Sequence, residues 1–418
     1  MNTITIKFGD VKKKRIATPN DFVSHMIEHI AWRMGLSIDL VWDNENWREL
    51  GRAFGVKIRS FRLLQKTAAT VGMIDDGSAE ITIDTREQYC RFSSSKTFDL
   101  DWFIKARCEQ VTDGRQLVAL LEGLSEGLGA GINVIVANVE DQHHTWEGIY
   151  RAVGIALSKL YTPQEEVVQA LKELQLDAAK PIKNDAQSEI QVLERSVNLA
   201  TVRRGTAETG VTVTIDFTRK QSNSWKIDVA ESIREATKDI PRLFEKFAKE
   251  AGFSMNVQFK AIVLSSSHVV FEDVGMVTGR ALLEILKMRM EKYGVNGAGC
   301  NVQTPEDIAQ NTVNVALSVE GRKFWRYIPF DGDFKRLREK FLIGSNVLGN
   351  LRTEDVDDFI DGLSGGMSAS IIVHLKKYDD ADSAWQEVFI GLGRSLKEVF
   401  DVNPYRRGVP PGVKATLV

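Results

Sequence analysis

A pair of adjacent histidines followed by a glutamate is the segment of this sequence best suited to chemistry. His143 and Glu147 are four residues apart, so they project from one face of a helix if a helix begins here. His144 points about 100° away and is free to serve a second centre or a neighbouring chain. An imidazole and a carboxylate on one helix face are a usual donor pair for a divalent transition metal. The alternative is a solvated helix start with two histidines by chance.

A second pair with the same spacing lies in the other half of the chain. His268 and Glu272 are again four residues apart, and they precede a long apolar run. The chain has only six histidines, so the recurrence of this spacing ahead of two similar runs indicates an internal repeat. We therefore expect a duplicated architecture.

Length, charge and cysteine content exclude several other classes of protein. The 418 residues suffice for two or three domains with sizeable cores. The net charge of −3 carries no signature of nucleic-acid binding, and the three scattered cysteines form neither a disulfide framework nor a paired zinc motif. No apolar stretch reaches membrane-spanning length, and the N-terminus alternates like a strand instead of resembling a signal peptide. We expect a cytoplasmic protein that binds neither nucleic acid nor membranes.

Strand-like and helical runs alternate along the chain, and their order recurs. Extended patterns predict strands at 3–8, 81–84, 131–137, 211–217, 255–259, 313–319 and 368–375. Amphipathic patterns predict helices at 21–34, 46–54, 115–127, 145–160, 240–251, 272–293, 355–362 and 384–400. The polar stretch 175–197 is typical of an interdomain linker or an exposed hairpin. It would divide the chain into two copies, 1–174 and 198–418, each internally duplicated.

These motifs resemble those of the imidazoleglycerol-phosphate dehydratases, a metal-dependent family of histidine biosynthesis. That family carries two His-His-x-x-Glu motifs per chain, one in each half of an internally repeated fold. The segment His143–Glu147 reproduces one such motif, and Arg204–Thr209 resembles the opening Arg-x-Thr-x-Glu-Thr strand of the family. Residues 406–414 resemble its phosphate-binding C-terminus. The resemblance covers nearly the whole chain except the linker, and it is weak outside these stretches.

The resemblance implies an α+β fold with two tandem imidazoleglycerol-phosphate-dehydratase-like domains. Each domain would be an internal repeat with a helix layer between two small mixed β-sheets. In copy one, Asn44–Arg48 replaces the first-half metal motif; in copy two, Asp382–Gln386 replaces the second-half motif. Active sites of the family lie between subunits, where a first-half motif meets a second-half motif. A composite site would therefore form where copy one meets copy two, within or between chains.

The resemblance also implies one or two divalent metals, manganese being the habit of the family. The implied ligands are His25, His143 and Glu147 for one centre, and His144, His268, Glu272 and Asp358 for the other. The first centre lacks its fourth family ligand, because Val269 occupies that position. A solvated helix carboxylate is an equally good interpretation of Asp358. His29, one turn after His25, would either support a ligand or be a plain helix-face histidine.

Four further residues correspond to substrate contacts of the family. Glu208 would be the general acid or base, since a carboxylate near a cation can exchange protons with a carbon or hydroxyl. Arg322 and Lys414 would hold an anionic group. Arg406 would assist them or lie on the surface.

The sequence thus predicts a metal-dependent dehydratase-like lyase, a hydro-lyase that acts on a small phosphorylated or anionic heterocycle. Imidazoleglycerol phosphate is one candidate substrate, and the divided site predicts a homo-oligomer. The alternative is a catalytically silent relative in which a structural metal holds an oligomer together. The anion-binding residues favour the enzyme, because a structural metal does not need them.

Overall fold

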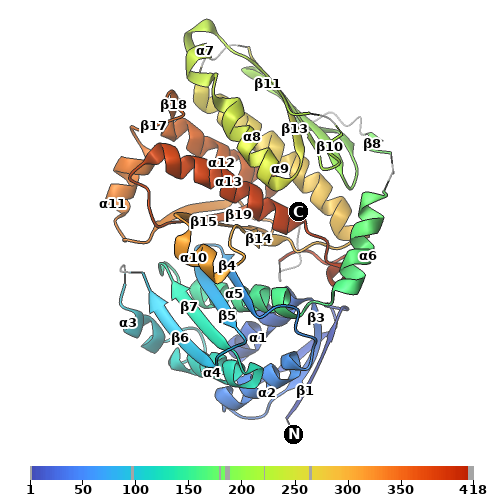
Figure 1. Cartoon of the computed structure of the whole chain (residues 1–418), viewed down its shortest axis with the longest axis vertical. Coiled ribbons are helices and arrows are strands. Elements are labelled where there is room, and N and C mark those ends of the chain that lie inside the picture. The colour runs from blue at the N-terminus through green and yellow to red at the C-terminus, as the bar shows by residue number, and fades with distance from the viewer. Residues whose placement is uncertain are drawn as a thin grey trace.

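The computed structural model describes residues 2–95, 98–177, 180–183, 189–220, 222–262 and 266–412. Lys414, one of the predicted substrate contacts, lies outside this part of the chain. Two α+β halves are stacked along the longest axis of the molecule, with the first half at the bottom of Figure 1. None of the described helices is long and apolar enough to cross a membrane.

The first half has four main helices that share one apolar core with two sheets. The sheets have the strand orders β1-β3-β2 and β4-β5-β7-β6. In chain order the elements are β1 (Thr3–Phe8), β2 (Lys14–Ala17), α1 (Asp21–Met34), β3 (Leu36–Val41), α2 (Trp47–Arg59), β4 (Thr67–Ile74), β5 (Gly77–Asp84), β6 (Tyr89–Ser94), α3 (Leu100–Lys105), α4 (Arg115–Leu128), β7 (Gly131–Val136), α5 (Gln142–Tyr161) and α6 (Gln164–Gln175).

The second half repeats this plan with sheets of order β12-β13-β11-β10-β9-β8 and β14-β15-β19-β16. Its elements are β8 (Ile182–Lys183), β9 (Ile190–Arg195), β10 (Leu199–Gly205), β11 (Thr209–Asp216), β12 (Ser224–Asp228), α7 (Glu231–Thr237), α8 (Ile240–Ala251), β13 (Ser254–Ala261), α9 (Ser267–Lys292), β14 (Ala298–Cys300), α10 (Pro305–Gln310), β15 (Val313–Val319), β16 (Phe324–Pro329), α11 (Phe334–Leu337), η1 (Arg338–Leu342), β17 (Asn346–Val347), β18 (Leu351–Arg352), α12 (Thr353–Met367), β19 (Ala369–Leu375), α13 (Ala381–Phe400) and η2 (Pro404–Arg406).

One strand pattern occurs in all four large sheets. In the first sheet, β3 pairs antiparallel with β1 and parallel with β2. The strands β7, β13 and β19 have the same two neighbours in the same directions. This fourfold repetition confirms the predicted fold class of two internally duplicated α+β copies.

The range 175–197, predicted as a linker, contains part of a sheet. β9 pairs antiparallel with β10, and the short strand β8 pairs with β9. These strands extend the edge of the six-stranded sheet of the second half. The division into domains at this range stays a prediction, but part of the range belongs structurally to the second half.

Glycines let the central helices of each half touch backbone to backbone. In the first half, a Cβ added at Gly123 of α4 would lie 1.8 Å from the carbonyl oxygen of Arg48 in α2. In the second half, a Cβ added at Gly366 of α12 would lie 2.0 Å from the carbonyl oxygen of Met276 in α9. The second crossing brings α9, which carries His268 and Glu272, next to α12, which carries Asp358.

Gly366→Ala is therefore expected to lower the free energy of unfolding by about 1–3 kcal/mol, because the added methyl group meets a backbone atom that cannot rotate away. Denaturant unfolding monitored by circular dichroism measures this effect. Gly205→Ala is the matched control, since no heavy atom lies within 4 Å of the added Cβ. Equal unfolding free energies for the two variants would contradict the close helix crossing.

The two halves meet through the faces of two sheets. Small and aliphatic side chains of β4, among them Val71 and Met73, share a buried cluster with Ala316 and Ile372 of the second half. At the same junction the buried Glu80 accepts hydrogen bonds from the side chains of three second-half residues: Asn314 (2.7 Å), Lys376 (2.9 Å) and His374 (3.1 Å). The junction is thus a packed interface with a buried charge network, and it places second-half residues close to the histidines of the first half.

Candidate metal centre

Two helices of the first half carry the histidines nearest to one another. Asn20 caps α1 by accepting a hydrogen bond from the backbone N–H of Val23, and Asp141 caps α5 by accepting one from His144. The capped start of α5 puts His143 in its first turn and Glu147 in the next. Because α1 packs against α5, His25 and the first turns of α5 come together.

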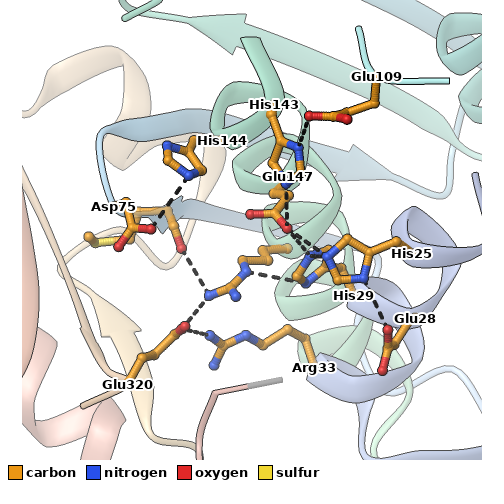
Figure 2. A network of polar contacts seen from close by, with 12 residues as sticks. His25, Glu28, His29, Arg33, Asp75, Glu109, His143, His144, Glu147 and Glu320 are labelled. Carbon is orange, nitrogen blue, oxygen red and sulfur yellow. Dashed lines mark hydrogen bonds and ion pairs between the residues drawn. The ribbon is translucent and has the colours of Figure 1, made fainter. Parts of the chain in front are cut away.

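Three imidazoles converge on one carboxylate oxygen, as Figure 2 shows. The Nε2 atoms of His25, His29 and His143 lie 2.6, 3.1 and 3.3 Å from Oε1 of Glu147. The Glu147 side chain is only 3% exposed. Within the described ranges, His25, His29 and Glu147 form the one group of three donor side chains close enough to share a metal ion.

The outer nitrogens of these rings show which imidazoles suit a metal. The Nδ1 atoms of His25 and His143 each lie 3.0 Å from a carboxylate, that of Glu28 and Glu109 respectively. A carboxylate that accepts the Nδ1–H leaves the Nε2 lone pair free for a metal, the usual outer arrangement of histidine ligands. Both rings therefore offer Nε2 on the side of Glu147.

His29 has the opposite arrangement. The Nε–H of Arg151 donates a hydrogen bond to Nδ1 of His29 at 3.2 Å, so the proton of a neutral His29 ring sits on Nε2 and faces Glu147. We therefore assign His29 to holding Glu147 in place. His143, whose Nε2 lies 3.3 Å from Oε1 of Glu147 but outside the group of His25, His29 and Glu147, would join His25 and Glu147 as a ligand after its ring moves closer to His25.

The pKa values of the group agree with these roles. Burial lowers the pKa of His25, but hydrogen bonds to Glu147 and Glu28 outweigh it and raise this pKa to about 9. Burial and the charge of Arg151 lower the pKa of His29 to about 3, so this ring stays neutral. Burial raises the pKa of Glu147, yet hydrogen bonds from His25 and His29 hold it far below its ordinary value. The carboxylate is thus ionised, as a ligand must be.

Metal affinity should consequently depend on pH. His25 must lose a proton before its Nε2 can bind a metal, and its pKa is about 9. Affinity should therefore rise by about tenfold per pH unit between roughly pH 7 and 9 and level off above that range. Competition titrations with a chromophoric chelator at each pH measure this slope. Glu28→Gln removes one cause of the raised pKa, so the plateau should begin at a lower pH; an affinity independent of pH in both proteins would exclude His25 as a ligand.

Glu320 connects the second half to this group. It follows β15 and accepts hydrogen bonds from Nη2 of Arg33 (2.5 Å), from Nη1 of Arg151 and from Ser318 (2.6 Å). Burial raises the pKa of Glu320, but Arg151 and Arg33 outweigh it and lower this pKa to about 2. Arg151 thus contacts both Glu320 and His29, so a chain of hydrogen bonds runs from the second half to Glu147.

His144 and Arg322 both contact Asp75. Nδ1 of His144 lies 2.6 Å from Asp76, and its Nε2 lies 3.6 Å from Oδ2 of Asp75. Arg322 of the second half forms an ion pair with the same oxygen of Asp75. His144 is accordingly turned away from Glu147 and toward Asp75 (Figure 2). The shared contact with Asp75 brings His144 together with the predicted anion-binding residue Arg322.

The other predicted ligands form a separate cluster at the start of α9. Nδ1 of His268 lies 3.4 Å from Asp358, and Glu272 is one turn further along the helix. Burial and neighbouring carboxylates, Glu272 among them, raise the pKa of Asp358 to about 6 despite His268. No hydrogen bond or ion pair within the described residues joins these three side chains to the first half. The structure therefore does not bring His268 together with His143 or His144 in one chain.

The remaining predicted contacts lie in two further places. Glu208 is exposed in the turn between β10 and β11, where its carbonyl accepts a hydrogen bond from the N–H of Ile262, shortly before α9. Arg406 is buried, contrary to the surface alternative, and donates to the carbonyls of Trp32 and Pro411 at 2.9 Å. Glu208 is thus closer along the fold to the His268 cluster, whereas Arg406 borders the junction between the halves.

Comparison with known proteins agrees with this duplicated architecture. The family model described as imidazoleglycerol-phosphate dehydratase matches residues 239–396. The enzyme of this name from Streptococcus sanguinis is 25% identical over 211 residues, which cover 50% of this chain and 95% of the relative. That from Methylorubrum populi is 26% identical over 220 residues, covering 52% of this chain and 98% of the relative. This chain is a relative of the imidazoleglycerol-phosphate dehydratases.

A whole dehydratase thus corresponds to half of this chain, as expected for two tandem copies. Among solved structures, the imidazoleglycerol-phosphate dehydratase from Pyrococcus furiosus aligns with 51% of this chain and 99% of its own, with a TM-score of 0.36 and 19% sequence identity.

The resemblance to the dehydratases did not predict the residues that hold the candidate metal ligands in place. The interpretation of the motifs missed Arg151, Glu109 and Glu320, and it left the role of His29 open. Helical spacing contained a usable signal, because His29 and Arg33 follow His25 at successive steps of four, and Arg151 follows Glu147 at the same step. Glu109 and Glu320 gave no such signal, since tertiary contacts alone bring them to the site.

Proposed function

We propose that this chain is a metal-dependent dehydratase-like lyase that acts on a small anionic heterocycle, with imidazoleglycerol phosphate the first substrate to test. The observation that carries the proposal is the convergence of the His25, His29 and His143 imidazoles on Glu147, with His25 and His143 held at Nδ1 by carboxylates. Kinship with the dehydratases supports the reaction class.

The residues of this chain divide the chemistry among them. His25, His143 and Glu147 would hold the metal, which when bound acts as a Lewis acid that stabilises charge on a heterocyclic ring as a proton leaves carbon. The Arg322 side chain is 43% exposed beside His144, so its guanidinium can still reach an anionic group of a substrate. Glu208 is exposed and would move a proton, provided that assembly brings it to the metal.

We infer that a second copy of the chain completes the site. The His268 cluster has an imidazole and carboxylates on the outside of α9 and α12, with the His268 side chain 44% exposed, and it makes no polar contact with His143 among the described residues of its own chain. A homo-oligomer in which the start of α9 faces the start of α5 of another chain would join the two clusters. Light scattering before and after chelation tests this assembly: a monomer at all concentrations would exclude it.

Direct assay tests the function. The protein, loaded with manganese, is incubated with imidazoleglycerol phosphate, and mass spectrometry follows loss of one water molecule from the substrate. Turnover should disappear after chelation, return with added metal, and be absent in His143→Ala. A metal-loaded, folded protein that leaves this substrate and related phosphorylated heterocycles unchanged would refute the lyase proposal.

The rival function is a silent relative that keeps the metal for its architecture. Two observations favour this rival: Glu147 is buried, and Arg322 already forms an ion pair with Asp75. Both side chains therefore have structural contacts without a substrate. It predicts a stoichiometric metal, a large fall in melting temperature on chelation, and no thermal shift with phosphorylated heterocycles. The enzyme predicts a thermal shift with substrate, since a ligand that binds the folded state stabilises it.

A further inference from the structure

A cavity of about 610 Å³ lies between the two halves, apart from the metal group. Residues of α5 and α6 line it from the first half, and residues of α8, α13 and β14 line it from the second. Its described lining does not include His25, His143, Glu147 or Glu320. The α5 residues that line it, Ile155, Ser158 and Lys159, lie beyond Arg151 toward the C-terminal end of the helix. The volume is in the range of small-molecule binding sites.

Two buried guanidinium groups border this cavity with unused hydrogen-bond donors. Arg33 and Arg406 are 4% and 1% exposed. Within the part of the chain that the structure describes, Nε and Nη1 of Arg33 and Nε of Arg406 have no hydrogen-bond partner. Buried donors of a charged group are costly when left unsatisfied, so such atoms usually mark the place of an additional ligand or water. Here all three donors belong to two residues that line one cavity.

The charges around the cavity favour an anion. Five cationic side chains line it, and three acidic ones: Arg33, Lys159, Arg394, Lys397 and Arg406 against Glu250, Glu398 and Asp401. Two of the acids pair with two of the cations, because Glu398 lies 3.0 Å from Lys159 and Glu250 lies 2.9 Å from Arg394. Arg33 pairs with Glu320, so Lys397 and Arg406 remain against Asp401. Burial and the charge of Glu398 raise the pKa of Asp401 to about 7, so this third acid carries only part of a negative charge near neutral pH.

Some of the cationic side chains are exposed at the entrance of the cavity, and others are buried. Arg394 and Lys397 are exposed on α13 at the rim, whereas Arg33 and Arg406 are buried. Exposed cations at an entrance attract anions over several ångströms, and buried guanidinium groups bind phosphate or carboxylate oxygens strongly in a water-poor setting. Asn403, next to Arg406, adds a buried acceptor, since its Oδ1 also lacks a partner among the described residues.

We propose that this cavity is a second ligand site, which binds a small organic anion, a phosphate monoester or a dicarboxylate, through Arg33 and Arg406. The site shares no residue with the proposed metal ligands and does not rest on the lyase function. Because both halves contribute to it, its ligand would stabilise their junction.

Calorimetric titration of the full-length protein tests the proposal. Glycerol phosphate and malonate are the two organic probes, and inorganic phosphate shows whether the anionic group alone suffices. Each titration is done in excess chelator and repeated with His143→Ala, so that metal-bound anion cannot contribute. We expect saturable binding of at least one probe with one site per chain, equal in both proteins; the stronger organic probe identifies the class of ligand.

Charge-reversal variants locate the binding. Lys397→Glu changes an exposed rim residue and should weaken binding by about threefold to tenfold. Lys335→Glu on α11 is the matched control, because this side chain is 85% exposed, does not line the cavity and gives the same net charge. Arg406→Gln should abolish binding; if it does not fold, the Lys397 and Lys335 pair still decides. Absence of saturable binding in the chelated protein, or equal weakening by both lysine variants, would overturn the proposal.

Discussion

Replacing Glu147 by glutamine is expected to weaken binding of a divalent metal by more than about 100-fold, because loss of a ligand exceeds the 10- to 100-fold effect of removing an outer partner. Glu147 is the point on which the three imidazoles converge, and hydrogen bonds keep it ionised. Glutamine preserves the shape but supplies no negative charge. Metal content after equilibrium dialysis and competition with a chelator both measure this change.

Glu140→Gln is the matched control for this substitution. Glu140 precedes α5 and pairs with Arg326 at 2.6 Å, outside the metal group. Its variant should bind metal like the parent protein. His29→Ala should lie between the two, since His29 positions Glu147 without offering Nε2 to the metal. Parental affinity in Glu147→Gln would show that the metal binds elsewhere or not at all.

Glu320→Ala is expected to lower the free energy of unfolding by about 3–5 kcal/mol, the usual cost of removing one partner of a buried ion pair. The loss leaves the charges of Arg33 and Arg151 close together without their shared carboxylate. Both guanidinium groups are nearly inaccessible, at 2% and 1% side-chain exposure. Denaturant unfolding gives the free-energy difference directly.

A comparison with an exposed acid separates this effect from the loss of any charge. Glu189 pairs with Arg204, and its side chain is 63% exposed. Glu189→Ala should change stability little, because exposed pairs contribute little. Metal affinity should fall in the Glu320 variant as well, since Arg151 would lose the contact that orients it toward His29. An unfolding curve of Glu320→Ala that matches that of Glu189→Ala would show that the junction does not depend on this charge cluster.

The amphipathic pattern predicted most of the long helices. Burial of one helix face determines both the spacing of apolar residues in the sequence and the way these helices pack. The range 145–160, for example, corresponds to α5 at Gln142–Tyr161, and 272–293 to α9 at Ser267–Lys292. The predicted starts fell three to five residues late. In α5 the first residues are the polar Gln142, His143 and His144, whereas α9 was predicted only from Glu272 onward although Val270 and Phe271 before it are buried.

The parallel edge strand of every repeat was missed. β2, β6, β12 and β16 are edge strands, each paired in parallel with a single neighbour. Three of them have mostly exposed or half-exposed side chains, as in β6 and β12, so the alternation of buried and polar residues is weak. A strand that owes its place to one neighbour depends on the rest of the sheet, and local sequence does not specify that partner.

Only part of the candidate metal centre was predictable, because helical spacing relates only residues on the same helix. His143 and Glu147 are one helix turn apart, so spacing alone relates them, whereas His25 contacts Glu147 across 122 residues of chain. The resemblance to the dehydratases supplied that long-range link. It could not supply Arg33, Arg151 and Glu320, because their contacts arise only where two unlike copies face each other. For the same reason the sequence did not predict that Arg406 is buried at the junction, since its neighbours Trp32 and Arg33 belong to the other half.

The covalent connection through α6 has a consequence for how this protein can change over generations. In an assembly of identical subunits, every substitution is repeated at all equivalent positions, so a lost ligand disappears from every site at once. Here the repeated strand pattern occurs in both halves of one polypeptide, so a substitution in one half leaves the equivalent position of the other half unchanged. The tether also keeps the unlike halves at a high effective concentration, so their junction does not depend on expression level. Each half can therefore acquire its own substitutions while the contact between the halves is kept.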